Sequence, residues 1–356
     1  MKAAYTRYDL DFRFEARTSR GSMWQKETYL LRLVADGDNP ADPEAPAAVG
    51  ECAVFRGLSA DDSPAYEQRV ERLCQAVNRG ETFDVSKWSS IKFGLECALV
   101  SADRGFSQVL FPTEFTTGLE QLPVNGLVWM DTVENMSRAA REKIEKGFTT
   151  IKLKIGAYDF EHELEMIDKL RMEFGPDILT IRLDANGAFA PDEALEKLKR
   201  LSELDIHSIE QPIKAGQWDR MAYLCENSPL PIALDEELIG IDTDDQRHKL
   251  LYYIHPQYIV LKPSLCGGLS GAGQWAEHAE KFGIGWWPTS ALESNVGLDA
   301  IAQWTAAMQP DVCSGLGTGQ LYTNNFESPL QMIGGRMWRD PSKRLTLPAL
   351  QWIVPE

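Results

Sequence analysis

The sequence lacks the features that would place it in a membrane or on a nucleic acid. No apolar run is long enough to cross a bilayer, and the opening segment MKAAYTRYDLDF has no uninterrupted apolar signal core. The 36 lysines and arginines are outnumbered by 53 aspartates and glutamates, and a net charge of −17 excludes a broad cationic face. We therefore expect neither a nucleic-acid nor a membrane partner.

Paired cysteines are absent as well. The six cysteines are scattered without a CxxC pair, and the five histidines do not cluster with them, which argues against a zinc site. Unpaired thiols are typical of a reducing compartment, so we expect a cytoplasmic protein. At 356 residues the chain is longer than a domain with one simple hydrophobic core usually is. We therefore expect two domains, or one barrel with an additional segment.

The first third predicts an α+β domain. Strands are expected at residues 1–14 and 28–33, with a polar loop at Thr18–Met23 between them. Two helices are expected at residues 65–78 and 86–102. A stretch rich in proline and glycine near 113–122 then reads as a linker. We assign residues 1–121 to this capping domain.

From residue 122 the chain repeats a strand–helix cadence. The expected strands are residues 126–130, 149–155, 179–184, 208–211, 231–235, 258–262, 285–288 and about 314–317. Repeats of this length are typical of βα units, and eight units close into a barrel of about 200–250 residues. We therefore expect an α/β fold, in which a modified, TIM-like (β/α) barrel over 122–329 carries the N-terminal cap. Residues 330–356 are expected to return to the cap.

Charged residues stand at the ends of five successive strands. Side chains alternate along a strand, so Lys152 and Lys154 share one face and Leu153 takes the other. The apolar face of a barrel strand packs against the outer helices, which turns both lysines inward. The same reasoning turns further polar side chains inward: Arg182, Asp184, Asn186, Glu210, Asp235 and Lys262. The carboxyl ends of barrel strands are where catalytic residues lie.

Asp184, Glu210 and Asp235 supply hard oxygen ligands without any histidine or cysteine. Mg²⁺ is the expected cofactor, with Mn²⁺ as a substitute. A small-molecule carboxylate bound to that ion would lose its α-hydrogen more easily, because the metal stabilises the enediolate. A lysine would be the base, and a neighbouring ammonium, as Lys152 is to Lys154, disfavours the charged form of a lysine. Singly, such motifs are usually solvated strands or turns, but together these charges would be costly to bury without a function.

Five motifs resemble the enolase superfamily, and in particular its muconate-lactonizing-enzyme subgroup, which carries lysines on the second and sixth barrel strands. The motifs are KLK at 152–154, DANGAF at 184–189, IEQP at 209–212, LDEEL at 234–238 and KPSLCGG at 262–268. A magnesium-stabilised ene-diolate with a lysine or histidine base is the general chemistry of that superfamily. The segment GWWPTS lacks a seventh-strand histidine, which disfavours the mandelate-racemase subgroup. Residues 286–304 and 123–129 look most like the o-succinylbenzoate synthase family.

The resemblance implies a lyase of menaquinone biosynthesis. It would convert 2-succinyl-6-hydroxy-2,4-cyclohexadiene-1-carboxylate to o-succinylbenzoate by syn loss of water. Lys154 would take the α-proton and return it to the departing hydroxide, and Lys262 would stabilise the enediolate through a cation–π contact with the ring. Asp184, Glu210 and Asp235 would bind the metal.

Supporting roles are implied for six more residues, which are Lys152, Asn186, Thr289, Ser290, Gly315 and Arg20. Lys152 and Asn186 would orient the carboxylate and the metal ligands. Thr289, Ser290 and Gly315 would contact the succinyl tail of the substrate. The alternative is that these three residues only form an ordinary turn. Arg20 would meet the distal carboxylate from a mobile loop, with a solvated loop arginine as the alternative.

Other functions stay open at this point. N-acylamino-acid racemases, dipeptide epimerases and cycloisomerases use the same lysine pair on the same scaffold. A Schiff-base aldolase, with Lys154 or Lys262 as nucleophile, and a non-catalytic barrel belong to different classes, and neither has a use for three carboxylates. A homo-oligomer is compatible with the sequence, which does not set the oligomeric state.

Overall fold

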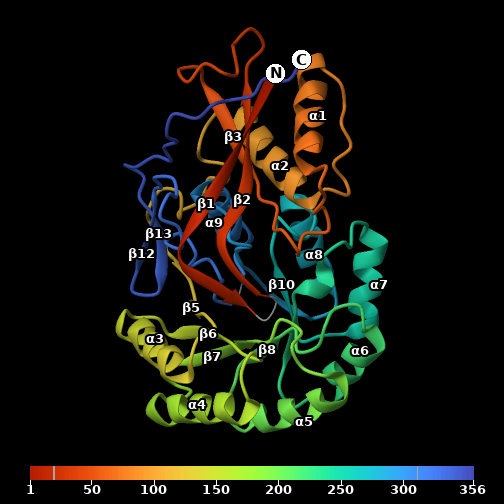
Figure 1. The fold of residues 1–356 in the computed structure, drawn as a ribbon, viewed down its shortest axis with the longest axis vertical. Helices are drawn as coiled ribbons and strands as arrows, with labels where there is room; N and C mark the ends of the chain where they lie inside the picture. The colour runs from red at the N-terminus through yellow and green to blue at the C-terminus, as the bar shows by residue number, and fades with distance from the viewer. Residues whose placement is uncertain (19–20, 311) are drawn as a thin grey trace.

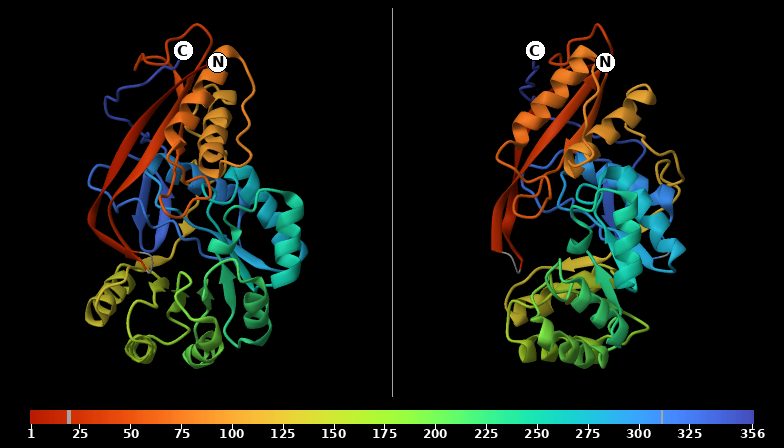
Figure 2. Two further views of the ribbon diagram at one scale, coloured as in Figure 1. Left: turned by 45° about the vertical axis from the view of Figure 1, so that its right-hand side comes forward. Right: turned by 90° about the vertical axis from the view of Figure 1, so that its right-hand side faces the viewer.

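The structure, a computed structural model, describes residues 1–18, 21–310 and 312–356. Within those ranges, no helix combines the length and the apolar character that a bilayer crossing requires. An N-terminal cap of strands and helices is stacked on a curled parallel sheet with helices on its outer side (Figures 1 and 2). This arrangement confirms the expected modified barrel with an α+β cap.

The cap is built on a long antiparallel ribbon. Strands β1 (Lys2–Thr18) and β2 (Gly21–Val34) pair with a register shift between Asp11 and Ala16, and β3 (Ala47–Cys52) adds to β2. Helices α1 (Tyr66–Arg79) and α2 (Ser89–Asp103) cover the sheet. The buried side chains between sheet and helices include Tyr5, Tyr29, Leu31, Val70, Leu73 and Ile91. Each contributes about 1.5–3 kcal/mol through burial, which holds the layers together.

Seven parallel strands form the curled sheet, in the order β11-β10-β9-β8-β7-β6-β5. Their bounds are β5 (Gly126–Val128), β6 (Thr150–Lys154), β7 (Thr180–Asp184), β8 (Ser208–Glu210), β9 (Ile232–Leu234), β10 (Tyr258–Leu261) and β11 (Gly285–Pro288). The helices that follow these strands are α3 (Val133–Glu145), α4 (Phe160–Glu173), α5 (Pro191–Ser202), α6 (Trp218–Asn227), α7 (Asp244–Ile254), α8 (Gly268–Lys281) and α9 (Asn295–Met308). A short 3₁₀ helix, η1 (Glu236–Leu238), precedes α7.

Side-chain caps explain where several of these helices begin. Thr132 accepts a hydrogen bond from the backbone of α3, and Asp159 does so for α4. Thr243 and Gln246 form a reciprocal capping box at α7. Such caps satisfy backbone N–H groups that have no partner within the helix, and each contributes about 1 kcal/mol.

The barrel closes through single residue pairs in place of a long eighth strand. Ser314 bridges to Val124, and Gly315 bridges to Thr289. The bonds from Gly315 N to the Pro288 carbonyl, at 2.8 Å, and from Asn125 N to the Ser314 carbonyl, at 2.9 Å, connect the two edges of the seven-stranded sheet. The expected eighth strand at 314–317 is thus reduced to these two bridging positions.

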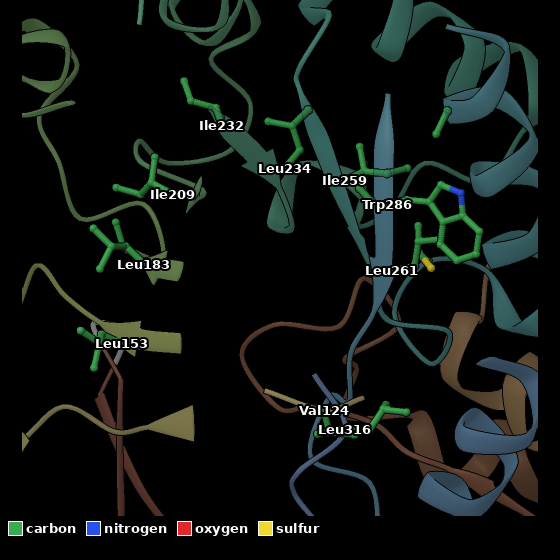
Figure 3. Packing of buried hydrophobic residues seen from close by; sticks show 14 of the residues in the cluster. Val124, Leu153, Leu183, Ile209, Ile232, Leu234, Ile259, Leu261, Trp286 and Leu316 are labelled. Carbon is green, nitrogen blue, oxygen red and sulfur yellow. The ribbon is translucent and has the colours of Figure 1, made fainter. Parts of the chain in front are cut away.

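The barrel strands turn apolar side chains outward and polar side chains inward. Leu153, Leu183 and Ile209 belong to the large hydrophobic cluster between strands and helices, and none is more than 1% exposed. Figure 3 shows this row of side chains along successive strands. Lys152 and Lys154, which flank Leu153, are therefore directed into the barrel.

The C-terminal segment contacts both parts of the molecule. Strands β12 (Leu330–Ile333) and β13 (Arg336–Arg339) form a hairpin that pairs with β4 (Leu122–Pro123) at the start of the barrel region. Further on, Ile353 exchanges two backbone hydrogen bonds with Tyr5 of β1, at 2.8 and 3.0 Å.

Two expectations about the cap were wrong in detail. The polar loop expected at Thr18–Met23 is wrong at both ends, because β1 extends to Thr18 and β2 begins at Gly21; residues 19–20 lie outside the described ranges. Strand β3 was not expected, since its sequence AAVGEC is made of small residues that follow a proline-rich stretch. It is stabilised by its neighbours: Gly50 and Gly94 allow β3 and α2 to approach so closely that a methyl group at Gly50 would lie 1.8 Å from the Gly94 carbonyl oxygen.

Candidate active site

The charged residues gather at the carboxyl ends of neighbouring strands. Lys154 and Asp184 are the last residues of β6 and β7, and Glu210 is the last residue of β8. The strand register places Lys154 beside Asp184, and Asp184 beside Glu210. Asp235 and Lys262 follow directly after β9 and β10. The parallel register therefore brings five distant sequence positions to one end of the barrel.

Lys152 and Lys154 share one carboxylate. The Lys154 Nζ donates to Asp184 Oδ2 at 2.9 Å and to Asn186 Oδ1 at 2.7 Å. The Lys152 Nζ lies 3.3 Å from the same Asp184 oxygen and donates to Glu210 Oε2 at 2.9 Å. Asp184 thus orients the amine that was expected to be the base.

Lys262 approaches from the other side of the cluster. Its Nζ forms an ion pair with Asp235 Oδ2. The side chains of Asp184, Glu210 and Asp235 are at most 2% exposed, and that of Lys262 is 12% exposed. Three ammonium groups, those of Lys262 and the two β6 lysines, therefore face three carboxylates in a nearly dry site, where charges interact strongly.

Burial and mutual charge set the protonation of the carboxylates. Burial and the neighbouring Asp184 carboxylate raise the pKa of Glu210 to about 8. Burial alone would raise the pKa of Asp184 too, but Lys154 and Lys152 reverse its effect, and the Asp184 pKa is lowered. Burial would raise the pKa of Asp235 as well, but the charge of Lys262 and the hydrogen bonds from Glu210 and Lys262 together outweigh it, and the pKa is lowered. Glu210 is thus the carboxylate with too little positive charge around it.

The carboxylates of the site raise the pKa of Lys152 and Lys262. Burial would lower the pKa of Lys152, but Glu210 and Asp184 more than offset it, so the pKa is raised. The pKa of Lys262 is raised for the same reason, with Asp235 as its strongest partner. At Lys152 and Lys262 the neighbouring carboxylates therefore outweigh burial and favour the ammonium form.

The carboxylates fit a divalent cation by their donor chemistry. Asp184, Glu210 and Asp235 offer hard oxygen donors from three consecutive strands, which suits Mg²⁺. Glu210 Oε1 is buried and accepts no hydrogen bond from the described residues. Among those residues, no three acidic, cysteine or histidine side chains already converge as a metal site, since each carboxylate is turned toward a lysine. A cation would supply the positive charge that Glu210 lacks.

A narrow pocket of about 60 Å³ joins this cluster to the cap. Its polar wall includes both β6 lysines, Asp184, Asn186 and Lys262. Its apolar walls are formed by Phe55, Leu58, Trp129, Leu265 and Leu292. The first two come from the cap, so both parts of the molecule enclose any ligand that reaches the lysines. Apolar walls together with a charged wall suit a ring that carries a carboxylate.

Thr289, Ser290 and Gly315 line the same pocket. Thr289 Oγ1 donates to the Gly315 carbonyl at 2.8 Å, and Ser290 Oγ donates to Glu293 Oε2 at 2.6 Å. A methyl group on Gly315 would lie 2.1 Å from Thr289 Oγ1, so only glycine fits there. These three residues therefore make ordinary turn contacts and also line the pocket. Arg20, by contrast, lies outside the described residues.

Asn186 and Gln211 orient the acidic residues. Asn186 adopts a left-handed backbone conformation with φ 43°, and its Nδ2 donates to Glu236 Oε1 at 3.0 Å. Gln211, with φ 41°, accepts at Oε1 from the backbone of Asp235 at 3.2 Å. Non-glycine residues in this conformation are uncommon and tend to occur at functional sites. Sequence reasoning missed Gln211, although the IEQP motif contains it.

Two further pocket features had no sequence signal. Thr318 lines the pocket, is 4% exposed, and its hydroxyl has no hydrogen-bond partner among the described residues. Phe55 lies in a loop of the cap, more than two hundred residues from Leu292, yet both belong to one hydrophobic cluster. Such contacts depend on tertiary structure, which no local pattern contains.

Comparison with known proteins identifies the family. The family model described as "Enolase C-terminal domain-like" matches residues 135–341. The o-succinylbenzoate synthase of Desulfotalea psychrophila is 44% identical, over 94% of this chain and 98% of its own length. The crystal structure of MenC from the same organism superposes with a TM-score of 0.83 at 41% identity, covering 95% of this chain and 99% of that one. An L-Ala-D/L-amino acid epimerase of a Maribacter species is 31% identical, over 85% of this chain and 86% of its own.

The matches to the Desulfotalea psychrophila enzyme and its structure extend over cap and barrel alike, and that relative is covered almost end to end. They agree with the chemistry of the site, in which lysines face carboxylates at the mouth of the barrel. The chain belongs to the enolase superfamily and, within it, to the family of o-succinylbenzoate synthase.

Proposed function

We propose that this protein is a magnesium-dependent o-succinylbenzoate synthase that dehydrates 2-succinyl-6-hydroxy-2,4-cyclohexadiene-1-carboxylate. The observation that carries this proposal is the 44% identity to an o-succinylbenzoate synthase over 98% of that relative. The pocket supports it, because apolar walls from cap and barrel face two lysines and an acidic cluster. A cyclic carboxylic acid matches that distribution of polar and apolar surface.

Lys154 is the proposed acid and base. Its Nζ takes the proton from the carbon beside the carboxylate, and the electron pair of that C–H bond moves into the enediolate. The C–O bond to the hydroxyl group then breaks, the same proton leaves with the oxygen as water, and the ring becomes aromatic. Asp184 and Asn186, at 2.9 and 2.7 Å from Nζ, hold the amine in one position for both steps.

Lys262 is the proposed electrostatic partner. Its ammonium stays charged, because Asp235 and Glu210 raise its pKa, and it faces the cluster from the β10 side. A fixed cation in a dry pocket stabilises negative charge that develops on the substrate. Its position also allows a cation–π contact with the substrate ring.

Asp184, Glu210 and Asp235 are the proposed ligands of Mg²⁺, with Mn²⁺ as a substitute. The ion, when bound, neutralises the substrate carboxylate and stabilises the enediolate. Lys152, between Asp184 and Glu210, keeps these two ligands oriented and reduces their repulsion. Thr289, Ser290 and Gly315 are the proposed contacts of the succinyl tail, and Arg20 remains a proposed contact from the cap.

The experiment is a magnesium-dependent assay with the cyclohexadiene carboxylate. We expect the diene absorbance to disappear in the presence of Mg²⁺, and this loss to stop when EDTA is added. The same preparation is offered L-Ala dipeptides, because the Maribacter relative is an L-Ala-D/L-amino acid epimerase. Epimerisation without dehydration would overturn the proposed reaction and leave the family unchanged.

We also infer that residues 1–121, 122–329 and 330–356 are the structural divisions of the protein. Limited proteolysis tests the divisions: first cuts near residues 121 and 329 are expected, and first cuts elsewhere would contradict these divisions.

We infer as well that the protein acts in the cytoplasm. All six cysteines are free thiols, five of them buried. Free thiols of this kind are typical of a reducing compartment.

A further inference from the structure

A buried lysine of the cap has no obvious structural partner. Lys26 lies on β2 and is 5% exposed. Its Nζ is buried and makes no hydrogen bond to any described residue. An ammonium group is strongly disfavoured in such a place unless nearby negative charge compensates it.

Two buried glutamates provide that charge. Glu51 of β3 and Glu293, just before α9, are both 0% exposed. Both lie against Gly297: a methyl group there would come within 2.8 Å of Glu293 Cβ and 2.9 Å of Glu51 Oε2. Lys26 and Thr28 are two residues apart on β2 and share one face of the strand, and Thr28 donates to Glu51 at 2.9 Å, so Lys26 lies on the side of β2 that faces these carboxylates. Burial lowers the pKa of Lys26, and the carboxylates of Glu51 and Glu293 are the two largest influences that oppose this change.

Glu51 is fully engaged in joining cap and barrel. Its Oε1 accepts hydrogen bonds from Thr28 Oγ1 and Ser294 N, both at 2.9 Å. Its Oε2 accepts from Ser294 Oγ at 2.5 Å and from Gly297 N at 2.9 Å. A carboxylate at the N-terminus of α9 is also favoured by the helix dipole. Glu51 therefore has ample stabilisation without Lys26.

Glu293 is stabilised differently, because it holds two loops of the site. Its Oε1 accepts from Ser264 Oγ at 2.5 Å, and its Oε2 accepts from Ser290 Oγ at 2.6 Å. Ser264 lies two residues after Lys262, in a turn whose backbone bonds to the Lys262 carbonyl. Ser290 lines the pocket. Glu293 thus connects the loop after β10 with the loop after β11.

We propose that Lys26 is a positioning residue, whose ammonium balances the charge of Glu293 and so keeps Ser264 and Ser290 in fixed donor orientations beside Lys262. Burial raises the pKa of Glu293, and the charge of Lys26 is the largest influence that opposes this rise. Without that charge the carboxylate takes up a proton more readily, and one serine hydroxyl must then accept a hydrogen bond. The loops after β10 and β11 lose their common anchor. The cap would therefore act on the reaction by charge, in addition to enclosing the pocket. This inference rests on the proposed function for its activity measurement.

The test compares Lys26→Met, Glu293→Gln and the double variant, each with Mg²⁺ and the cyclohexadiene substrate, with kcat and KM determined separately. Lys26→Met is expected to lower kcat/KM about 10- to 100-fold, the coupling found between buried neighbours. Glu293→Gln carries no charge, so the double variant is expected to recover about tenfold over Lys26→Met. In a protein that already carries Ser264→Ala, Lys26→Met should lower kcat/KM by a smaller factor than it does in the wild type. Lys2→Met is the matched control, because Lys2 donates to the Asn78 carbonyl within the cap.

A purely structural lysine would give a different pattern. Lys26→Met would then lower the melting temperature but leave kcat/KM of the folded enzyme within twofold of wild type, and this result overturns the proposal. If Lys26→Met does not fold, recovery of folding and turnover in the double variant supports the proposal, and loss of both overturns it. A wild-type enzyme without turnover contradicts the proposed function alone. The same variants are then compared by urea unfolding, where additive effects of Lys26→Met and Glu293→Gln overturn the positioning role.

Discussion

Single side chains at the mouth of the barrel carry the proposed chemistry, and Lys154 is the sharpest case. Its Nζ is held by two acceptors, one on Asp184 and one on Asn186. Lys154→Ala is expected to reduce kcat by more than the roughly 10²–10⁴-fold typical of one lost acid or base, since one amine serves two steps. Steady-state kinetics measure the loss, while circular dichroism and magnesium titration should show an intact fold and metal site.

Lys169 provides a control for that experiment. It lies on α4 in an exposed ion pair with Glu165, and such pairs contribute little. Lys169→Ala should therefore leave turnover unchanged. A Lys154→Ala enzyme with a wild-type rate would show that another group is the base.

Lys262→Ala should also be severe, for a different reason. Its removal leaves Asp235 buried without its ion-pair partner and removes a fixed cation from the pocket. Loss of one preorganised electrostatic contact typically costs about 10²–10³-fold in kcat. Stopped-flow measurement at saturating substrate tests the value. An effect confined to KM would indicate that Lys262 only binds substrate.

The residues of the site differ in how far the sequence could reveal them. Strand alternation was enough to place Lys152, Lys154 and Leu153 on their correct faces, because a period of two is a local property. Glu293 and Thr318 could not be found this way. The serines that bond to Glu293 come from loops that meet only when the barrel closes, and a glutamate in a loop has no local sign of burial. Thr318 has no hydrogen-bond partner among the described residues, and nothing in its sequence neighbourhood indicates that it is buried.

At the scale of elements, α9 illustrates how tertiary contact can reverse a helix preference. A Gly→Ala change inside a helix normally stabilises it by up to about 1 kcal/mol. At Gly297 of α9 the added methyl group would meet Glu293 and Glu51 at under 3 Å, so Gly297→Ala should destabilise by about 1–3 kcal/mol. Gly273 of α8 has open space around it, and Gly273→Ala should stabilise. Urea unfolding of the two variants measures both signs, and equal signs would contradict this account.

The amino-terminal end of β8 has a pH-sensitive contact. Burial and the nearby Arg182 lower the pKa of His207 to about 4, and its ring stacks on Tyr258 at 5.1 Å. A histidine with a lowered folded pKa binds its proton more readily when unfolded. Its contribution to stability is therefore complete above about pH 6.5 and is lost as the pH falls toward 4.

His207→Gln should remove this component of the pH dependence. Between pH 6.5 and 4 we expect the unfolding free energy of wild type to fall by about 1–2 kcal/mol more than that of the variant, after allowance for partial exposure. Urea titrations at a series of pH values give the difference. Parallel curves for the two proteins would mean that His207 titrates normally in the folded state.

The elements themselves were predictable where their pattern is local. Strands β6 and β7 have alternating faces and strong flanking signals, and the expected ranges contain them. The β12–β13 hairpin was missed, because its strands at Leu330–Ile333 and Arg336–Arg339 are short and partly exposed. They are stabilised by pairing with β4, a contact across more than two hundred residues.

For the whole molecule, stability and metal binding should be linked. The proposed ligands come from three strands of one barrel, so the ion binds the folded protein and not the unfolded chain. Binding of this kind stabilises by about 2.7 kcal/mol when the free ion is at 100 times its Kd. The melting temperature in EDTA is therefore expected to rise when Mg²⁺ is added, and the rise should continue as the logarithm of concentration.

The large negative charge of the chain makes the control for that measurement essential. A protein of net charge −17 is stabilised by any added salt, because screening reduces its internal repulsion. A control with NaCl at matched ionic strength measures this contribution. Only the part of the rise in melting temperature that exceeds the NaCl control is due to binding at the site. Asp184→Asn should abolish that remainder while keeping the response to NaCl, since the rest of the surface charge is unchanged. A rise that NaCl reproduces in full would mean that the acidic cluster holds no divalent ion, and stabilisation of the enediolate would then depend on the lysines that line the pocket.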